Sequence, residues 1–289
     1  MFHVERMSKT QYNKILEATD HLVSGESFSI HWDPIHHRAW TAVEHLESLE
    51  AYYESSDYIS HSSKPDSFIS LLYFWARSFM LNYKYALLKK HLQPDGRLLD
   101  IGCGTGSFLS FMKKKGFEGF GFESNVKARN ICLQNDIEVH SNESKLLPSS
   151  FDTITLWHVL EHLAQPESSL ANYRELLKPG GILVIAVPNF ESYDRIHYQN
   201  DWAALDVPRH LWHFTPKGII SMAEVCGFDL LQKKPLRLDV FYISFLSEKF
   251  KRKSFPLIRG LVKASWFSFK ALFSGKHSSW TFIFRKRLP

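Results

Sequence analysis

The sequence predicts an α/β fold built around a doubly wound, mostly parallel sheet. Residues 98–109 form an apolar run that ends in Asp100, followed by three alternate glycines and then a helical apolar pattern. A buried parallel strand that enters a glycine turn and a helix is the first unit of such a sheet, because glycine brings bare backbone N–H groups close to a ligand. Strand-like runs at 119–123, 137–139 and 182–187 alternate with helical segments, as expected of successive βαβ units.

A chain of 289 residues is long enough for one main domain and a smaller appendage. We expect an N-terminal extension over residues 1–65, a helical cap over 66–94 and the main domain over 95–289. Within the main domain, a lid insert is expected near 190–216 and a basic amphipathic insert near 248–276.

The part of the chain before the glycine-rich run divides into two patterns. The first 65 residues mix His, Ser, Tyr and Trp without a sustained period, which predicts short strands and turns. Between residues 66 and 91 apolar side chains recur at helical spacing, so one or two helices are expected to cover the sheet. Residues 94–96, Pro-Asp-Gly, then turn the chain into the strand at 97–100.

Two acids stand at the ends of the first two predicted strands. Glu123 closes the run at 119–123 and lies 23 residues after Asp100. In doubly wound sheets an acid at this position of the second strand holds ribose hydroxyls, although a surface glutamate is the alternative interpretation. Asp100 favours a ligand that carries an ammonium group and would repel a pyrophosphate, so the pattern favours a nucleoside-like cation over a dinucleotide.

Residues 98–109 resemble motif I of class I S-adenosylmethionine-dependent methyltransferases, and residues 151–162 resemble the fourth strand of that family with the turn after it. The resemblance covers about residues 95–289 and implies a Rossmann-like sheet of seven strands with an antiparallel last strand, near 280–285. It implies S-adenosylmethionine as the cofactor. For the adenine, Asn142 and Glu143 are alternatives. The implied cofactor contacts are Asp100, Gly102, Cys103, Gly104, Thr105, Gly106, Glu123, Ser124, Asn142, Glu143, Trp157 and His158.

Methyl transfer requires a donor and an acceptor held in line and, for a hydroxyl or an acidic carbon, removal of a proton. Imidazole suits that task because it titrates near neutral pH. The candidate catalytic residues are His158, considered first, and His162, His210 and His213. The last two belong to residues 201–215, which are similar to a Pro-Arg-His-x-x-His-Phe-Thr stretch of the family and are expected to cover the substrate pocket. His210 and His213 could equally be core histidines bonded to the backbone.

The Val-Leu-Glu-His turn at 159–162 is shared with methyltransferases of small molecules such as ubiquinone-type phenols, sugars and polyketide intermediates. The resemblance therefore implies O- or C-methylation of a small-molecule acceptor. An Asn-Pro-Pro-Tyr/Phe motif, typical of amino-group methylation, is absent after the fourth strand. The alternatives are a non-catalytic cofactor-binding or interaction protein, and an RNA or protein methyltransferase that uses a basic C-terminus.

The positive charge is concentrated at the C-terminal end. The chain has a formal net charge of +5, and residues 249–289 contain eleven Lys and Arg but no Asp or Glu. Nucleic acid is not favoured as a partner, because a basic stripe is more often a solvated helix face. Apolar positions at 257–273, with Arg259, Lys263 and Lys270 on another face, predict a basic amphipathic helix. We expect it to cover the core; the alternative is peripheral contact of residues 249–276 with a bilayer.

Cysteine usage and the lack of a secretory pattern predict a reducing, cytoplasmic setting, since the three cysteines are widely spaced. No apolar stretch reaches the ~20 residues that span a bilayer. No metal is expected, because His31, His36 and His37 lack the paired zinc-ligand spacing. Family relatives carry a cysteine-bearing ribbon before the Tyr-Tyr segment at 52–53, so the resemblance implies a relic of that module without its metal ligands. The oligomeric state is left open.

Overall fold

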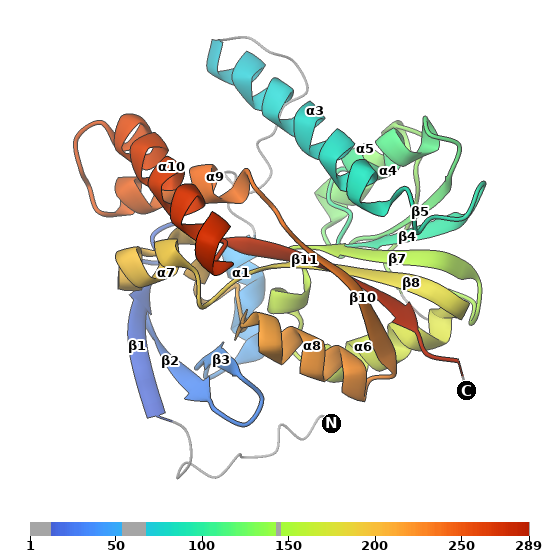
Figure 1. Cartoon of the computed structure of the whole chain (residues 1–289), viewed down its shortest axis with the longest axis horizontal. Coiled ribbons are helices and arrows are strands. Elements are labelled where there is room, and N and C mark those ends of the chain that lie inside the picture. Colours follow the sequence, from blue (N-terminus) through green and yellow to red (C-terminus); the bar gives the residue numbers. More distant parts are fainter. Residues whose placement is uncertain (1–12, 54–67, 143–145, 289) are drawn as a thin grey trace. The chain divides into compact units, whose positions relative to one another are not determined.

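The computed structural model of the chain describes residues 13–53, 68–142 and 146–288 (Figure 1). The chain divides into two compact units. The large-sheet unit comprises residues 54–187, 222–238 and 279–289, and the small-sheet unit comprises residues 1–53, 188–221 and 239–278. The division into an extension, a helical cap and a main domain with two inserts stays a prediction.

The large-sheet unit is built on seven strands in the order β10-β11-β8-β7-β4-β5-β6. The pairs from β8 to β6 are parallel and the pair β10–β11 is antiparallel, which confirms the predicted α/β fold and its antiparallel last strand. The strands are β4 (Arg97–Ile101), β5 (Glu118–Phe122), β6 (Glu138–His140), β7 (Phe151–Trp157), β8 (Leu177–Pro188), β10 (Phe228–Pro235) and β11 (Ser279–Lys286).

Helices cover both faces of this sheet, so its central strands are continuous apolar runs. Leu98, Leu99 and Ile101 on β4 are buried. Figure 1 shows α4 and α5 on the face opposite to α6. The apolar side chains of α3 and α4 join those of β4 and β8 in one core cluster. The helices are α3 (Phe68–Leu88), α4 (Ser107–Lys113), α5 (Val126–Gln134) and α6 (Pro166–Leu176).

Strand β8 differs from the sequence prediction at its start. The predicted strand covers residues 182–187, yet β8 begins at Leu177 and includes residues 178–181, Lys-Pro-Gly-Gly. The register shifts between residues 151 and 153 of β7, so residues 178–181 form an irregularity within the strand. Lys178 Nζ donates to both carboxylate oxygens of Asp152, at 2.7 and 2.9 Å, and so keeps this irregular segment on the sheet.

The small-sheet unit contains an antiparallel sheet in the order β1-β2-β3-β9. Three strands come from the N-terminal segment, as predicted, and the fourth comes from the stretch expected to form a lid. Trp212 and His213 pair with Trp40 and Ala39, so the two segments share one sheet. The strands are β1 (Asn13–Thr19), β2 (Ser27–Asp33), β3 (Arg38–Thr41) and β9 (Trp212–Phe214).

Three helices of this unit pack on one core cluster, which includes Ile30, Tyr198, Trp202 and Phe267. They are α7 (Tyr193–Tyr198), α9 (Asp239–Phe250) and α10 (Pro256–Ser274). Helix α1 (Glu50–Tyr53) also belongs to the unit, whereas α8 (Pro216–Val225) runs from one unit into the other. Among the described residues, no helix has both the length and the apolar character needed to cross a membrane.

Helix α10 corrects one expectation. We predicted that α10 covers the core, and it does pack on the core cluster, but its apolar side chains at 257, 258, 261, 262, 269, 272 and 273 are all exposed. The helix packs instead through Gly260, Ala264, Phe267 and Ala271. A Cβ on Gly260 would lie 2.8 Å from Phe245 Cα, so only small residues allow the close approach of α10 to α9.

Candidate functional site

The loop between β4 and α4 combines three left-handed glycines with open space at one of them. Gly102, Gly104 and Gly106 have φ values of 63°, 55° and 72°. A Cβ on Gly106 would lie 2.3 Å from Ile137 Cδ1, whereas a Cβ on Gly104 would meet nothing within 4 Å. The loop is therefore packed by its own unit at Gly106 and open at Gly104, where the backbone can receive a ligand.

Asp100 lies at the end of β4, and its carboxyl group is buried, with 3% of the residue exposed. Thr155 Oγ1 on the neighbouring strand β7 donates a hydrogen bond of 2.5 Å to its Oδ1. Burial raises the pKa of Asp100, the Thr155 hydrogen bond and the Lys84 ammonium lower it, and the nearby Glu123 charge raises it, so that the net pKa is about 7. A buried carboxyl with so little compensation suits a cationic ligand group, which would stabilise its charged form.

Glu123 directly follows β5 and faces the glycine loop. Its Oε2 accepts a hydrogen bond from the Gly104 backbone N–H at 2.8 Å, and its Oε1 accepts one from the Asn125 N–H at 2.8 Å. Both carboxylate oxygens are thus held beside the open glycine. This geometry places an acceptor pair where a diol of a ligand over Gly104 could donate.

The other residues predicted to contact the cofactor differ in their exposure. Cys103 is buried, and Thr105 Oγ1 lies 3.2 Å from Ser107 Oγ at the start of α4. Ser124 and Asn142 are exposed after β5 and β6. Glu143 lies outside the described residues. Cys103, Cys132 and Cys226 are free thiols.

The turn after β7 lies against the glycine loop. A Cβ on Gly102 would lie 2.6 Å from Val159 Cγ2, so the two segments are in direct contact. Trp157 packs edge-to-face on Phe108 of α4, with ring centroids 5.5 Å apart. Residues 157 and 158 therefore lie beside the loop that Asp100 and Glu123 flank.

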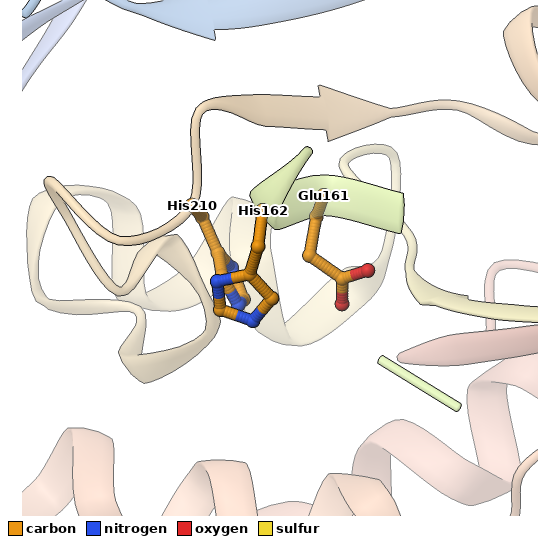
Figure 2. Close-up of side chains that lie close together, drawn as sticks. All are labelled: Glu161, His162 and His210. Carbon is orange, nitrogen blue, oxygen red and sulfur yellow. The ribbon is translucent and has the colours of Figure 1, made fainter. Parts of the chain in front are cut away.

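His158 has a left-handed backbone, with φ of 58°, and its side chain is held by an acid. Its Nδ1 lies 3.3 Å from Oε1 of Glu161, a residue that is 1% exposed. Figure 2 shows Glu161 and His162 on the short 3-10 helix η3 (Leu160–His162). Because the carboxylate occupies Nδ1, the other ring nitrogen of His158 is oriented by this pair, as in base–acid dyads of enzymes.

Two of the candidate catalytic histidines, His210 and His213, lie in the small-sheet unit and have partners within that unit. His210 Nδ1 lies 2.9 Å from the Ala204 carbonyl oxygen; Figure 2 also labels this residue. Thr41 Oγ1 donates to the His210 carbonyl oxygen at 2.7 Å, so it accepts from His213 Nε2 at 2.9 Å. Burial, followed by the charges of His210 and Arg195, lowers the pKa of His213 well below its ordinary value. His213 is thus a neutral donor that joins β9 to β3.

Sequence reasoning did not single out Lys84, Thr155 or the role of Glu161. Lys84 on α3 lies 4.2 Å from the Trp157 ring and acts on the charge of Asp100. The position of Lys84 in a helical pattern did not indicate this role, because the apolar periodicity shows which face of the helix is buried but not which strand end the other residues approach. For Thr155, the available signal was a hydroxyl side chain between the apolar residues 154 and 156.

Comparison with known proteins agrees with this geometry. Residues 74–233, more than half of the chain, match the family described as Methyltransferase domain. The chain is 28% identical over 153 residues to the ubiquinone biosynthesis O-methyltransferase of Cereibacter sphaeroides, covering 48% of this chain and 62% of the relative. It is 31% identical over 109 residues to that of Azoarcus sp., covering 34% and 47%. The chain thus matches less than two thirds of the length of these relatives.

Solved structures share the fold. The cyclopropane synthase MmaA2 from Mycobacterium tuberculosis aligns with a TM-score of 0.52 at 17% identity, over 71% of this chain and 84% of that one. A putative sarcosine dimethylglycine methyltransferase from Galdieria sulphuraria aligns with a TM-score of 0.51 at 17% identity, over 74% and 86%. With the family match, the glycine loop and the strand-end acids, these findings show that the chain belongs to the class I S-adenosylmethionine-dependent methyltransferases.

Proposed function

We propose that the protein methylates a hydroxyl group of a small, phenol-like acceptor. The observation that carries the proposal is the His158–Glu161 pair. The pair lies in the turn after β7, and Val159 of the same turn contacts the glycine loop. A phenolic hydroxyl must lose a proton as it attacks, and an imidazole oriented by a buried carboxylate can accept that proton. The relatives named as ubiquinone biosynthesis O-methyltransferases support an oxygen acceptor.

In this proposal the large-sheet unit holds S-adenosylmethionine through groups described above. Asp100 would accept a hydrogen bond from the ammonium group, and Glu123 would accept hydrogen bonds from the ribose hydroxyls. The open space at Gly104 would let the cofactor approach the backbone closely. Asn142 would lie at the adenine, and Trp157 would form a wall of the pocket. When bound, the cofactor supplies an electrophilic methyl group on a sulfonium.

The residues of the chain act by positioning and by proton removal. An in-line displacement needs a donor and an acceptor held at fixed geometry, and this positioning contributes much of the rate. His158 takes the hydroxyl proton in this proposal, with Glu161 as its positioning residue. His162 stays a further candidate base, and the internal hydrogen bonds of His210 and His213 favour positioning roles for those two residues.

The test of the proposal is a screen of acceptors with the purified protein and S-adenosylmethionine. Phenols, sugars and carbon acids are offered in parallel, and S-adenosylhomocysteine and the methylated product are measured by mass spectrometry. Methylation on a phenolic oxygen is the expected result. Methylation at carbon or nitrogen, or cofactor binding without turnover on any acceptor, would contradict it.

His158→Ala is expected to lower turnover with the acceptor about 100-fold, because general-base catalysis contributes on that order, while the affinity for S-adenosylmethionine stays nearly unchanged. Initial rates and calorimetric titration measure the two effects. His91→Ala is the control, since His91 contacts Gln232 and plays no part in the proposed chemistry. Equal losses in rate and cofactor affinity would make His158 a binding residue instead.

Two glycine variants separate ligand approach from folding. The Cβ of Gly104→Ala would meet no neighbouring atom, so only the left-handed backbone conformation should lower the free energy of unfolding, by about 1–2 kcal/mol. Cofactor binding is also expected to weaken, because the methyl group occupies the open space at this position. Gly106→Ala must also displace Ile137, and about 2–4 kcal/mol is expected. Urea unfolding and titration with S-adenosylmethionine measure both variants. Unchanged cofactor affinity in Gly104→Ala would contradict an approach at that glycine.

A further inference from the structure

Helix α10 turns large apolar side chains away from its own unit. Eight of them are between 47% and 79% exposed, and together we call them the apolar face of α10. At 100° per residue they cover about half of the helix circumference. A helix that only covers a core would present charged residues on its outer side, so this face requires another explanation. The residues are Leu257, Ile258, Leu261, Val262, Trp266, Phe269, Leu272 and Phe273.

The packing of α10 does not use this face. The buried stripe consists of Gly260, Ala264, Phe267 and Ala271, on the opposite side of the helix. Figure 1 shows α10 running alongside α9, and at Gly260 the two backbones are in close contact. The large apolar side chains are therefore available without any loss of the contacts that hold the helix.

Charged groups determine how α10 is rotated about its axis. Glu248 on α9 is fully buried and accepts from Arg259 Nε at 2.8 Å and from Lys263 Nζ at 2.6 Å. Lys270 Nζ lies 4.4 Å above the ring of Tyr193. Turning the apolar face inward would break both charge-assisted bonds and leave the carboxylate of Glu248 buried without them. The outward orientation is thus built into the α9–α10 pair.

The charge around the apolar face indicates what it contacts. Arg252 and Lys253 precede the helix, Lys276 follows it, and all three are exposed. No acid occurs in residues 249–289. A second copy of the chain would bring this basic segment against itself, which electrostatics disfavours. An anionic lipid surface offers negative headgroups for the basic ends and acyl chains for the apolar side chains.

We propose that the apolar face of α10 docks the protein on anionic lipid bilayers, with its aromatic and aliphatic side chains in the acyl boundary and Arg252, Lys253 and Lys276 among the headgroups. The contact is peripheral and uses only the small-sheet unit. It goes beyond the proposed methylation and does not depend on the identity of the acceptor.

The test is co-sedimentation of the full chain with vesicles of phosphatidylcholine alone or of equal parts phosphatidylcholine and phosphatidylglycerol. Wild-type protein is expected to sediment with the anionic vesicles and weakly with the neutral ones. Phe269→Ser/Phe273→Ser is expected to lower partitioning about 10-fold or more, because two exposed rings no longer enter the acyl boundary. Leu133→Ser/Val225→Ser removes two equally exposed apolar side chains elsewhere and is the matched control.

Additional measurements make the outcomes distinguishable. Calorimetric titration with S-adenosylmethionine on the same variants checks the fold and the cofactor site independently of lipid binding. Arg252→Gln/Lys253→Gln is expected to lower sedimentation with anionic vesicles only. No sedimentation with either vesicle, equal sedimentation of wild type and the phenylalanine variant, or a concentration-dependent dimer that this variant abolishes would each overturn the proposal.

Discussion

Asp100→Asn is expected to lower the affinity for S-adenosylmethionine about 100-fold, because a buried carboxylate that pairs with a ligand ammonium is replaced by a neutral amide. The substitution is nearly isosteric. The asparagine oxygen can still accept the hydrogen bond that Thr155 donates to Asp100 Oδ1. The fold of the ligand-free protein is therefore expected to persist, and calorimetric titration measures the change in affinity.

Asp136→Asn serves as the control, since Asp136 is exposed and its left-handed backbone is one that asparagine accepts readily. Cofactor affinity in this variant is expected to equal that of wild type. An Asp100→Asn protein that binds the cofactor as tightly as wild type would remove Asp100 from the cofactor site.

The affinity is also expected to depend on pH through Asp100. Burial raises the pKa of Asp100 to about 7 in the ligand-free protein, so the carboxyl group is protonated below that pH and must release its proton to meet an ammonium. Affinity should therefore rise as the pH increases from 6 toward about 7. In Asp100→Asn this rise should be absent, and titrations across that range measure it.

The same pKa shift makes the stability of the ligand-free protein fall with increasing pH, whereas the cofactor affinity rises. The folded-state pKa of Asp100 lies above its ordinary value of 3.8, so the folded state binds more protons between the two values. The free energy of unfolding that this group contributes is thus largest at low pH and falls as the pH rises through about 7. Saturating cofactor should offset the loss, because the ligand binds the ionised form.

Arg209→Met is expected to lower the free energy of unfolding by about 3–5 kcal/mol, because it leaves the buried Asp20 and the partly buried Asp206 without their cation. The side chain of Arg209 is 2% exposed. Its Nε donates to both carboxylate oxygens of Asp206, at 3.1 Å each, and its Nη2 donates to Asp206 Oδ1 at 2.5 Å and Asp20 Oδ1 at 3.3 Å. Urea unfolding followed by circular dichroism measures the loss.

Arg287→Met is the matched control. Arg287 also bonds an acid, Asp229, but both side chains are about half exposed, and exposed pairs contribute little. Its unfolding midpoint is expected to stay at the wild-type value. Equal midpoints for Arg209→Met and wild type would show that the buried pair does not stabilise the small-sheet unit.

Asp20 gives the Arg209 network a pH dependence. Burial raises the pKa of Asp20, but the N–H groups of Ser24 and Leu22 and the charge of Arg209 outweigh it, so the net pKa is lowered. The contribution of Asp20 is therefore present above its ordinary pKa of 3.8 and is lost as the pH falls below it.

The features that the sequence determined are local ones. An apolar strand that ends in Asp100, three glycines within five residues and an acid at Glu123 each follow from side-chain period or from backbone freedom over a few neighbouring positions. Such patterns predicted a doubly wound parallel sheet and the ends of its first strands, and the family resemblance that they carry implied seven strands with an antiparallel last strand. They also predicted that the C-terminal basic segment forms an amphipathic helix, which α10 confirms.

The tertiary structure decided the features that depend on distant segments. Arg209 meets Asp20 across 189 positions of sequence, β9 pairs with β3, and Lys84 approaches the ring of Trp157. No local period marks such partners. The orientation of α10 is also tertiary, because two apolar sides of one helix look alike in sequence, and only the close contact at Gly260 and the pairing with Glu248 select which side is buried.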